Sequence, residues 1–273
     1  MKNNITTTLL SALTICSLIL AADTLHAQAN GPVASNANYA VSVNSDIPAS
    51  LNTLIEYFDN KGVDLRTFLA DSRFELYDGI GDRFRRSAER RVLTLEEYQR
   101  ILGFEAKKRN ISGFIDANID QLKKAEAEYD IPRYVIAAII GIESDFGKNI
   151  GSFNPLNAYV SMYAEGYRAE FARAQLDELL QFTERNKIDV FELKSSYAGA
   201  MTFAQFIPYS LNRWFVGDDI FDMNNNILSV GNYLAHFKNI TGSLERSVFR
   251  YNPSQMYTDA VMALAAEAEK MYN

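Results

Sequence analysis

The stretch Asp130-Ile-Pro-Arg-Tyr-Val-Ile-Ala-Ala-Ile-Ile-Gly-Ile-Glu-Ser-Asp-Phe-Gly147 decides how we interpret this chain. Pro132 stands at the start of the apolar run, where a missing N–H costs a helix nothing, and Asp130 just before it can act as a cap. Side chains 134–142 are apolar or small on every face, which is typical of a buried helix. Gly147 is a typical stop signal. The sequence therefore predicts a buried helix that carries Glu143 near its C-terminal end.

Glu143 is the candidate catalytic residue of this helix. Apolar surroundings and the negative end of the helix dipole both disfavour a carboxylate, so we expect the pKa of Glu143 to be raised. A carboxyl group with a raised pKa can act as a general acid near neutral pH. The alternative is a boundary glutamate that points to water, because glutamate is rarely buried unless it is paired.

The N-terminus predicts export. Lys2 precedes an apolar run from Leu9 to Ala22, and Ala27-Gln-Ala29 follows. A positive charge, an apolar segment and an A-x-A cleavage site together define a secretory signal peptide, here residues 1–29. A membrane anchor is the alternative, but the run is shorter than the ~20 residues that a span needs. We therefore expect no membrane span in the mature protein.

Composition argues against several classes of protein. The chain of 273 residues is 48% hydrophobic, which supports a sizeable core, and its net charge of −7 without a long basic run argues against a nucleic-acid partner. Cys16, the only cysteine, lies in the signal region, so the mature chain has no thiol nucleophile. Of the two histidines, His26 and His236, only His236 could serve a Ser-His-Asp triad, and a zinc site of several His or Cys ligands cannot be built. Carboxylate chemistry and oxygen-ligand metal chemistry remain.

Helical patterns fill most of the mature chain. Residues 30–49 are small and polar, which predicts a flexible linker. From Leu51 onward apolar residues recur at helical spacing, Thr94-Leu-Glu-Glu has the pattern of a capping box, and no clear run of alternating strands occurs. We therefore predict one mainly α domain over residues 50–273, with helical lobes around a cleft.

The segment from Ser195 to Ser210 is the second unusual stretch. It reads Ser-Ser-Tyr-Ala-Gly-Ala-Met-Thr-Phe-Ala-Gln-Phe-Ile-Pro-Tyr-Ser, so small residues alternate with aromatic ones. Gln205 must find a partner if it is buried there; the alternative interpretation is tight helix packing. Further on, Asp218, Asp219 and Asp222 lack the alternating ligands and central glycine of an EF-hand loop, so we predict no metal site.

These segments together resemble the lytic murein transglycosylases of the membrane-bound B type. The motifs that carry the resemblance, in the family's order and at similar spacings, are Gly141-Ile-Glu-Ser144, Ser196-Tyr-Ala-Gly-Ala-Met-Thr-Phe-Ala-Gln-Phe-Ile-Pro208 and Arg250-Tyr-Asn252. The resemblance implies a lysozyme-like, mainly α fold with helical lobes around a glycan-binding cleft. It also implies cleavage of the MurNAc–GlcNAc bond of peptidoglycan without water, which leaves a 1,6-anhydroMurNAc end.

The resemblance implies a role for Glu143 as general acid and then general base, with no cofactor. It implies that Ser196 hydrogen-bonds the catalytic glutamate and that Gln205 lies in the glycan cleft. The family's aspartate-rich, calcium-loop-like segment is shortened here around 217–222, which puts metal binding in doubt. The substrate-binding residues implied are Ser196, Gln205, Tyr251, Asn252 and Tyr98.

Two alternatives stay open. A muramidase on the same fold would use water in place of the muramyl C6 hydroxyl. A non-catalytic peptidoglycan-binding protein would keep the cleft, although binding alone does not need a proton donor such as Glu143. All three hypotheses imply peptidoglycan glycan strands as the partner and a periplasmic location, and we expect a monomer.

Overall fold

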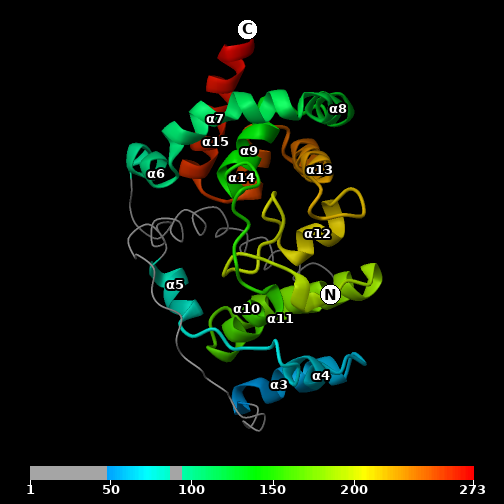
Figure 1. Ribbon diagram of the computed structural model, residues 1–273. Helices are drawn as coiled ribbons and strands as arrows, with labels where there is room; N and C mark the ends of the chain where they lie inside the picture. The colour runs from blue at the N-terminus through cyan, green and yellow to red at the C-terminus, as the bar shows by residue number, and fades with distance from the viewer. Residues whose placement is uncertain (1–47, 87–93) are drawn as a thin grey trace.

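A computed structural model describes residues 48–86 and 94–273 (Figure 1). The predicted signal peptide, 1–29, and residues 30–47 of the predicted linker lie outside the described residues. In the part of the chain that the structure describes, no helix combines the length and apolar character needed to cross a membrane.

The described residues form helices that are joined by short irregular segments, and their strand pairing is limited to isolated bridges. The helices are η1 (Ala49–Leu51), α3 (Asn52–Asp59), α4 (Leu65–Leu69), α5 (Ile80–Arg86), α6 (Leu95–Ile101), α7 (Phe104–Ala117), α8 (Ile119–Tyr129), α9 (Arg133–Ser144), α10 (Pro155–Ala164), α11 (Ala169–Asn186), η3 (Val190–Glu192), α12 (Pro208–Trp214), α13 (Met223–Thr241), α14 (Leu244–Tyr251) and α15 (Gln255–Tyr272). The predicted capping box is confirmed, because Thr94 and Glu97 exchange both of its hydrogen bonds at the start of α6.

The helices form two groups (Figure 1). A lower group contains α3, α4, α5, α10 and α11, in which α10 packs along α11. An upper group contains α6 to α9 and α13 to α15. Helix α12 contacts both α11 and α13, and the buried apolar side chains of both groups belong to one continuous core. The two groups are therefore lobes of one folded unit.

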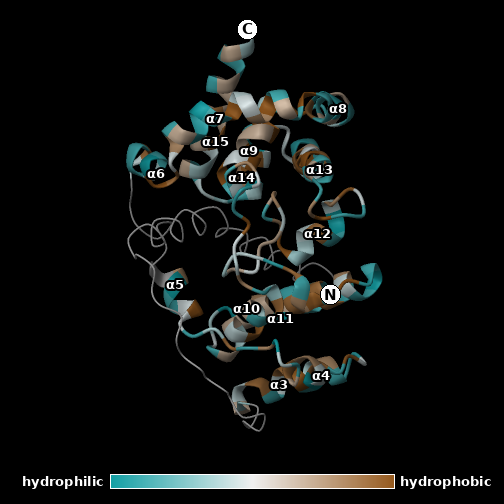
Figure 2. Ribbon diagram, in the orientation of Figure 1, coloured by the Kyte–Doolittle hydropathy of each residue, from teal (hydrophilic) through white to brown (hydrophobic). Residues whose placement is uncertain are grey.

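Helix α9 is the central element of the upper group. Every residue from Tyr134 to Ser144 is buried, as the apolar sequence predicts, and α7, α8, α13 and α15 all pack against it. The hydropathy colouring of Figure 2 shows the contrast with the outer helix α8, which carries many hydrophilic residues. Burial on all sides fixes where the C-terminal end of α9 lies.

One local prediction about α9 is wrong. Asp130 does not cap this helix; it ends α8 in a left-handed conformation, with φ of 53°, and its carboxylate accepts a 2.8 Å hydrogen bond from Lys238 of α13. Pro132 occupies the N-cap position of α9, and the backbone N–H of Arg133, the first residue of the helix, instead donates a 3.0 Å hydrogen bond to the Glu126 side chain of α8. The Asp130 carboxylate, which could have capped α9, instead binds Lys238, a residue distant in sequence.

Candidate active site

Glu143 lies at the C-terminal end of α9 and is 0% exposed. The alternative of a glutamate that points to water is therefore wrong. The hydroxyl of Tyr257, on α15, donates a hydrogen bond of 2.8 Å to Oε1 of Glu143. A carboxyl group held in an apolar interior with a specific donor has the surroundings that proton transfer requires.

The backbone turns sharply directly after Glu143. Asp145 and Phe146 both adopt left-handed conformations, with φ of 50° and 61°, which is costly for a bulky residue such as Phe146. The Phe146 ring folds back over Gly141, where an added Cβ would lie 2.6 Å from a ring carbon, and it packs against Phe114 of α7 at a centroid distance of 5.2 Å. Because Gly141 has no side chain, the Phe146 ring can pack against the helix there and fix the end of α9.

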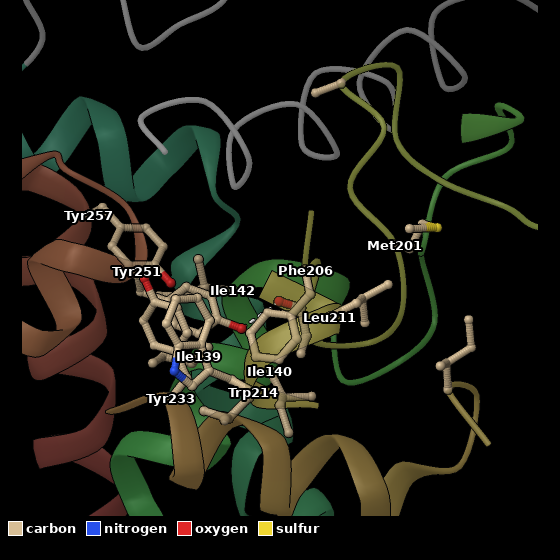
Figure 3. Close-up of a cluster of buried hydrophobic side chains, with 14 of the residues drawn as sticks. Ile139, Ile140, Ile142, Met201, Phe206, Leu211, Trp214, Tyr233, Tyr251 and Tyr257 are labelled. Carbon is tan, nitrogen blue, oxygen red and sulfur yellow. Dashed lines mark hydrogen bonds between the residues drawn. The ribbon is translucent and has the colours of Figure 1, made fainter. Parts of the chain in front are cut away.

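Tyr257 is a site residue that the sequence did not reveal. It is fully buried, and burial, followed by the nearby Glu143 charge, raises its pKa well above the usual value. The hydroxyl therefore stays protonated and remains a donor. Figure 3 shows Tyr257 next to Tyr251, beside Ile139 and Ile142 of α9. The only local signal is its place three residues after Ser254, which caps α15.

Two of the predicted substrate-binding residues lie near this donor. Tyr98 from α6 and Tyr251 from α14 both contribute to the electrostatic environment of the Tyr257 hydroxyl. Tyr98 is 0% exposed, and α6 packs against α15. Tyr98 therefore comes close to Tyr257 although the two are far apart in sequence.

Tyr251 and Asn252 end α14 and join it to the segment that contains Gln205. The Tyr251 hydroxyl donates a 2.5 Å hydrogen bond to the carbonyl oxygen of Ala204. Asn252 is the C-cap of α14 and is fully buried, with its backbone N–H on the carbonyl of Val248 at 3.3 Å. This pair therefore fixes the position of Gln205 relative to the upper lobe.

Gln205 is buried and has a left-handed backbone, with φ of 50°. Its side-chain Nε2 donates to the carbonyl oxygens of Thr202, at 2.9 Å, and Ile150, at 3.4 Å. Its Oε1 is buried without a hydrogen-bond partner among the described residues. The requirement for a partner is thus met at the nitrogen, and the oxygen remains an available acceptor.

Ser196 is also buried, but it does not contact Glu143 in the way that the resemblance implies. Its Oγ accepts a 3.3 Å hydrogen bond from the backbone N–H of Ala200, and no hydrogen bond joins it to Glu143 within the described residues. Isolated bridges pair Ser195 with Phe153 and with Met201. Ser196 therefore belongs to a tightly bridged segment, and its observed bond stabilises that segment's own turn.

Asp219 and Asp222 of the 217–222 segment accept hydrogen bonds from backbone N–H groups. Asp222 Oδ1 accepts the N–H of Asn225 at 2.8 Å and caps α13, and Asp219 accepts a backbone N–H at 2.8 Å. The fully buried Asn226 accepts the N–H of Ala204 at 3.1 Å. Within residues 48–86 and 94–273, no group of three or more His, Cys, Asp or Glu side chains is arranged to hold a metal ion. Since Asn226 Nδ2 also donates to the carbonyl oxygens of Ile220 and Asp222, its side chain joins this segment to the one that contains Gln205.

Comparison with known proteins identifies the class of molecule to which this fold and buried acid belong. Residues 50–245 match the family described as the transglycosylase SLT domain, and the chain belongs to that family. The family resemblance and the mainly α, lysozyme-like fold class predicted from the sequence are confirmed.

Individual relatives agree with this assignment. Membrane-bound lytic murein transglycosylase B of Escherichia coli (strain K12) is 30% identical over 123 residues, which are 44% of this chain and 34% of that protein, so the match spans about a third of the relative. Soluble lytic transglycosylase SltB1 from Pseudomonas aeruginosa has a TM-score of 0.73 at 25% identity, over 82% of this chain and 99% of that chain. SltB3 from Pseudomonas aeruginosa, solved in complex with NAG-NAM-pentapeptide, has a TM-score of 0.69 at 19% identity, over 80% of this chain and 78% of that one. The named relatives have the enzyme class that the sequence predicts.

Proposed function

We propose that this chain is an exported lytic transglycosylase that cleaves the MurNAc–GlcNAc bond of peptidoglycan and leaves a 1,6-anhydroMurNAc end. The observation that carries the proposal is Glu143, which is fully buried at the end of α9 with the Tyr257 hydroxyl on one of its oxygens. Membership of the transglycosylase SLT domain family supports the reaction type. The complex of the relative SltB3 with NAG-NAM-pentapeptide supports a glycan strand as substrate.

The proposed reaction needs one carboxyl group used twice. Neutral Glu143 gives its proton to the glycosidic oxygen as the bond from that oxygen to the muramyl anomeric carbon breaks. The Glu143 carboxylate then takes the proton of the C6 hydroxyl as that oxygen bonds to the same carbon. The enzyme ends in its starting protonation state, and no water is consumed. The hydrogen bond from Tyr257 stabilises the carboxylate between the two transfers.

The other carboxyl group near Glu143 is a poor second catalyst. Most glycosidases use two carboxyl groups at a set separation. Asp145 follows α9 in a left-handed conformation, and its Oδ1 lies 3.4 Å from Nζ of Lys107. We therefore assign assistance at the anomeric carbon to the substrate's own N-acetyl group.

The substrate-binding roles also belong to the proposal. The buried Oε1 of Gln205 supports a role as acceptor for an N–H or hydroxyl donor of the glycan. Tyr98 lies near the Tyr257 hydroxyl that binds the acid, whereas Tyr251 and Asn252 hold the Gln205 segment in place. Ser196 shapes the same segment. We further propose a periplasmic location and a monomeric state, in keeping with the predicted signal peptide.

The experiment incubates the mature protein with purified peptidoglycan and analyses the soluble muropeptides by mass spectrometry. Anhydro-muropeptides, each lighter than its hydrolysed counterpart by one water, are expected from the wild type and from Glu56→Gln, an exposed control on α3. Glu143→Gln is expected to release none. Products with reducing ends would make the protein a muramidase, and sedimentation with peptidoglycan without release would make it a binding protein. Full activity in Glu143→Gln would contradict the assigned acid.

A further inference from the structure

A buried lysine lies at the same end of α9 as the catalytic acid. Lys107, on α7, is 7% exposed, although lysine is almost never buried without a partner. Its Nζ lies 3.4 Å from Oδ1 of Asp145, the C-cap residue of α9 and the second residue after Glu143. Helices α7 and α9 pack directly against each other. A positive charge is therefore held inside the protein next to the site.

The ion pair with Asp145 does not account for the burial of this lysine. Burial lowers the pKa of Lys107, and this effect exceeds the opposing attraction of Asp145 and Glu143. The Asp145 side chain is 40% exposed, so water screens part of its charge. It also lies 4.0 Å from the exposed Lys148. A purely structural ion pair would gain little from desolvating its lysine so strongly.

Electrostatic influence on Glu143 provides a reason for the burial. Interactions between charges are stronger in a dry interior than at the surface, and Glu143 is one of the two acids that attract Lys107. Among the described residues, the titratable and charged groups that act on Tyr257 and Lys107 are Glu143 itself, Tyr251 on α14, Tyr98 on α6, and Asp145 and Lys148 after α9. The buried Lys107 and its partner Asp145 thus place a positive and a negative charge beside Glu143.

The remaining neighbours of α9 do not alter this picture. Helix α8 also packs on α9, but its charged contact, the ion pair of Glu126 with Arg133, lies at the N-terminal end of α9. Helix α13 packs on α9 too, and within the described residues it contributes no titratable side chain to the electrostatics of Lys107 or Tyr257.

We propose that Lys107 is a positioning residue for the reaction, because its ammonium group stabilises the carboxylate form of Glu143, and that Asp145 moderates this effect. The inference rests on the proposed function, in which Glu143 loses and regains a proton in each turnover. Too strong a positive field would leave Glu143 ionised and unable to donate. Too weak a field would leave the carboxylate poorly stabilised after donation. With Lys107 and Asp145 both charged, the positive field at Glu143 lies between these limits.

The proposal predicts opposite effects of removing the two charges. Lys107→Met keeps an unbranched apolar side chain and removes the positive charge, so the titration midpoint of Glu143 should rise by about 0.5 to 1 pH unit. Asp145→Asn removes the opposing negative charge, so the midpoint should fall. The double variant should return close to the wild type. A role in packing alone gives no reason for shifts of opposite sign.

The midpoint can be measured without turnover. Proteins labelled with ¹³C at the glutamate carboxyl are titrated by NMR, and the Glu143 resonance is identified by its absence in Glu143→Gln. Lys108→Met is the matched control on the same helix, since its side chain is 37% exposed and pairs with Glu105 and Glu267, not with Asp145. Thermal unfolding checks that each variant is folded. Asp145→Asn alters a partly exposed side chain, so it still tests the proposal if Lys107→Met does not fold.

The rate profile gives a second readout. Because Glu143 must be protonated to donate, kcat/KM falls as the pH rises through the midpoint, and Lys107→Met should remain active to higher pH. Equal midpoints in all variants, or shifts of the same sign in the two single variants, would overturn the role of Lys107. Wild-type protein that releases no anhydro-muropeptides would overturn the proposed function instead, while the NMR titration would still decide the inference.

Discussion

At the scale of single residues, the hydrogen bond from the Tyr257 hydroxyl to Glu143 can be tested most directly by kinetics. A hydrogen bond to a charged group contributes about 1.5 to 3 kcal/mol, so Tyr257→Phe should lower kcat by roughly tenfold to a hundredfold. The measurement is the initial rate of muropeptide release at saturating peptidoglycan.

A second buried tyrosine supplies the control for this variant. The buried Tyr233 hydroxyl donates a 2.7 Å hydrogen bond to the carbonyl oxygen of Arg250, so Tyr233→Phe removes a comparable hydroxyl that does not bind Glu143. It should lower the unfolding temperature and leave kcat close to the wild type. Equal losses of kcat in the two variants would refute a specific role for Tyr257.

The two residues of this contact differ in how far the sequence reveals them. Glu143 could be selected because its apolar neighbours are adjacent in the chain, and local periodicity predicts burial. Tyr257 is separated from Glu143 by 114 positions, so no local pattern links them. For the same reason the need of Gln205 for a partner could be anticipated, but the carbonyl of Ile150, 55 positions away, could not be named.

At the scale of the structural element, the turn after α9 depends on the space above Gly141. An added Cβ there would lie 2.6 Å from the Phe146 ring, which must then move. Gly141→Ala should therefore destabilise the protein by about 1 to 3 kcal/mol, as overpacking does, and lower activity by displacing the end of α9. Chemical denaturation and the rate of muropeptide release measure the two effects.

Gly113 in the middle of α7 is the matched control, because a Cβ there meets no atom within 4 Å. Gly113→Ala should stabilise the protein by about 0.5 to 1 kcal/mol and leave activity unchanged. If Gly141→Ala behaved like Gly113→Ala, the Phe146 ring would not be fixing the end of the helix.

Elements were predictable where their signals are local. The apolar run of α9 and the capping box of α6 are patterns within a few residues, and both predictions are correct. The role of Asp130 was not predictable, because Lys238 approaches it from a helix 108 positions away. The segment 195–207 has bridges and few helical bonds, so its shape depends on contacts with Phe153 and Asn226.

At the scale of the whole molecule, one continuous core joins both lobes, so the domain should unfold in a single transition. Trp214 is the only tryptophan, and its helix α12 contacts α11 of the lower lobe and α13 of the upper lobe. Its fluorescence and the far-ultraviolet circular dichroism of all helices should therefore change at the same denaturant concentration. Two separated midpoints would show that the lobes are independent.

The fold class of the whole molecule was predictable because helical periodicity extends over most of the chain. The arrangement of two lobes was expected only in outline, since the contacts of α12 with α11 and α13 are tertiary. The predicted division at residue 29 lies outside the described residues, and the one at residue 49 is not tested, so both stay predictions.

Complete burial of α9 separates the position of the acid from the admission of substrate. The helix that carries Glu143 can exchange its amide hydrogens only when the core opens, whereas under the proposed function a glycan strand would enter past segments with few helical bonds. Evolution can thus vary the admitting segments, and with them the strands that are accepted, at little cost to the proton donor. Lineages with different cell walls would then diverge around an unchanged acid.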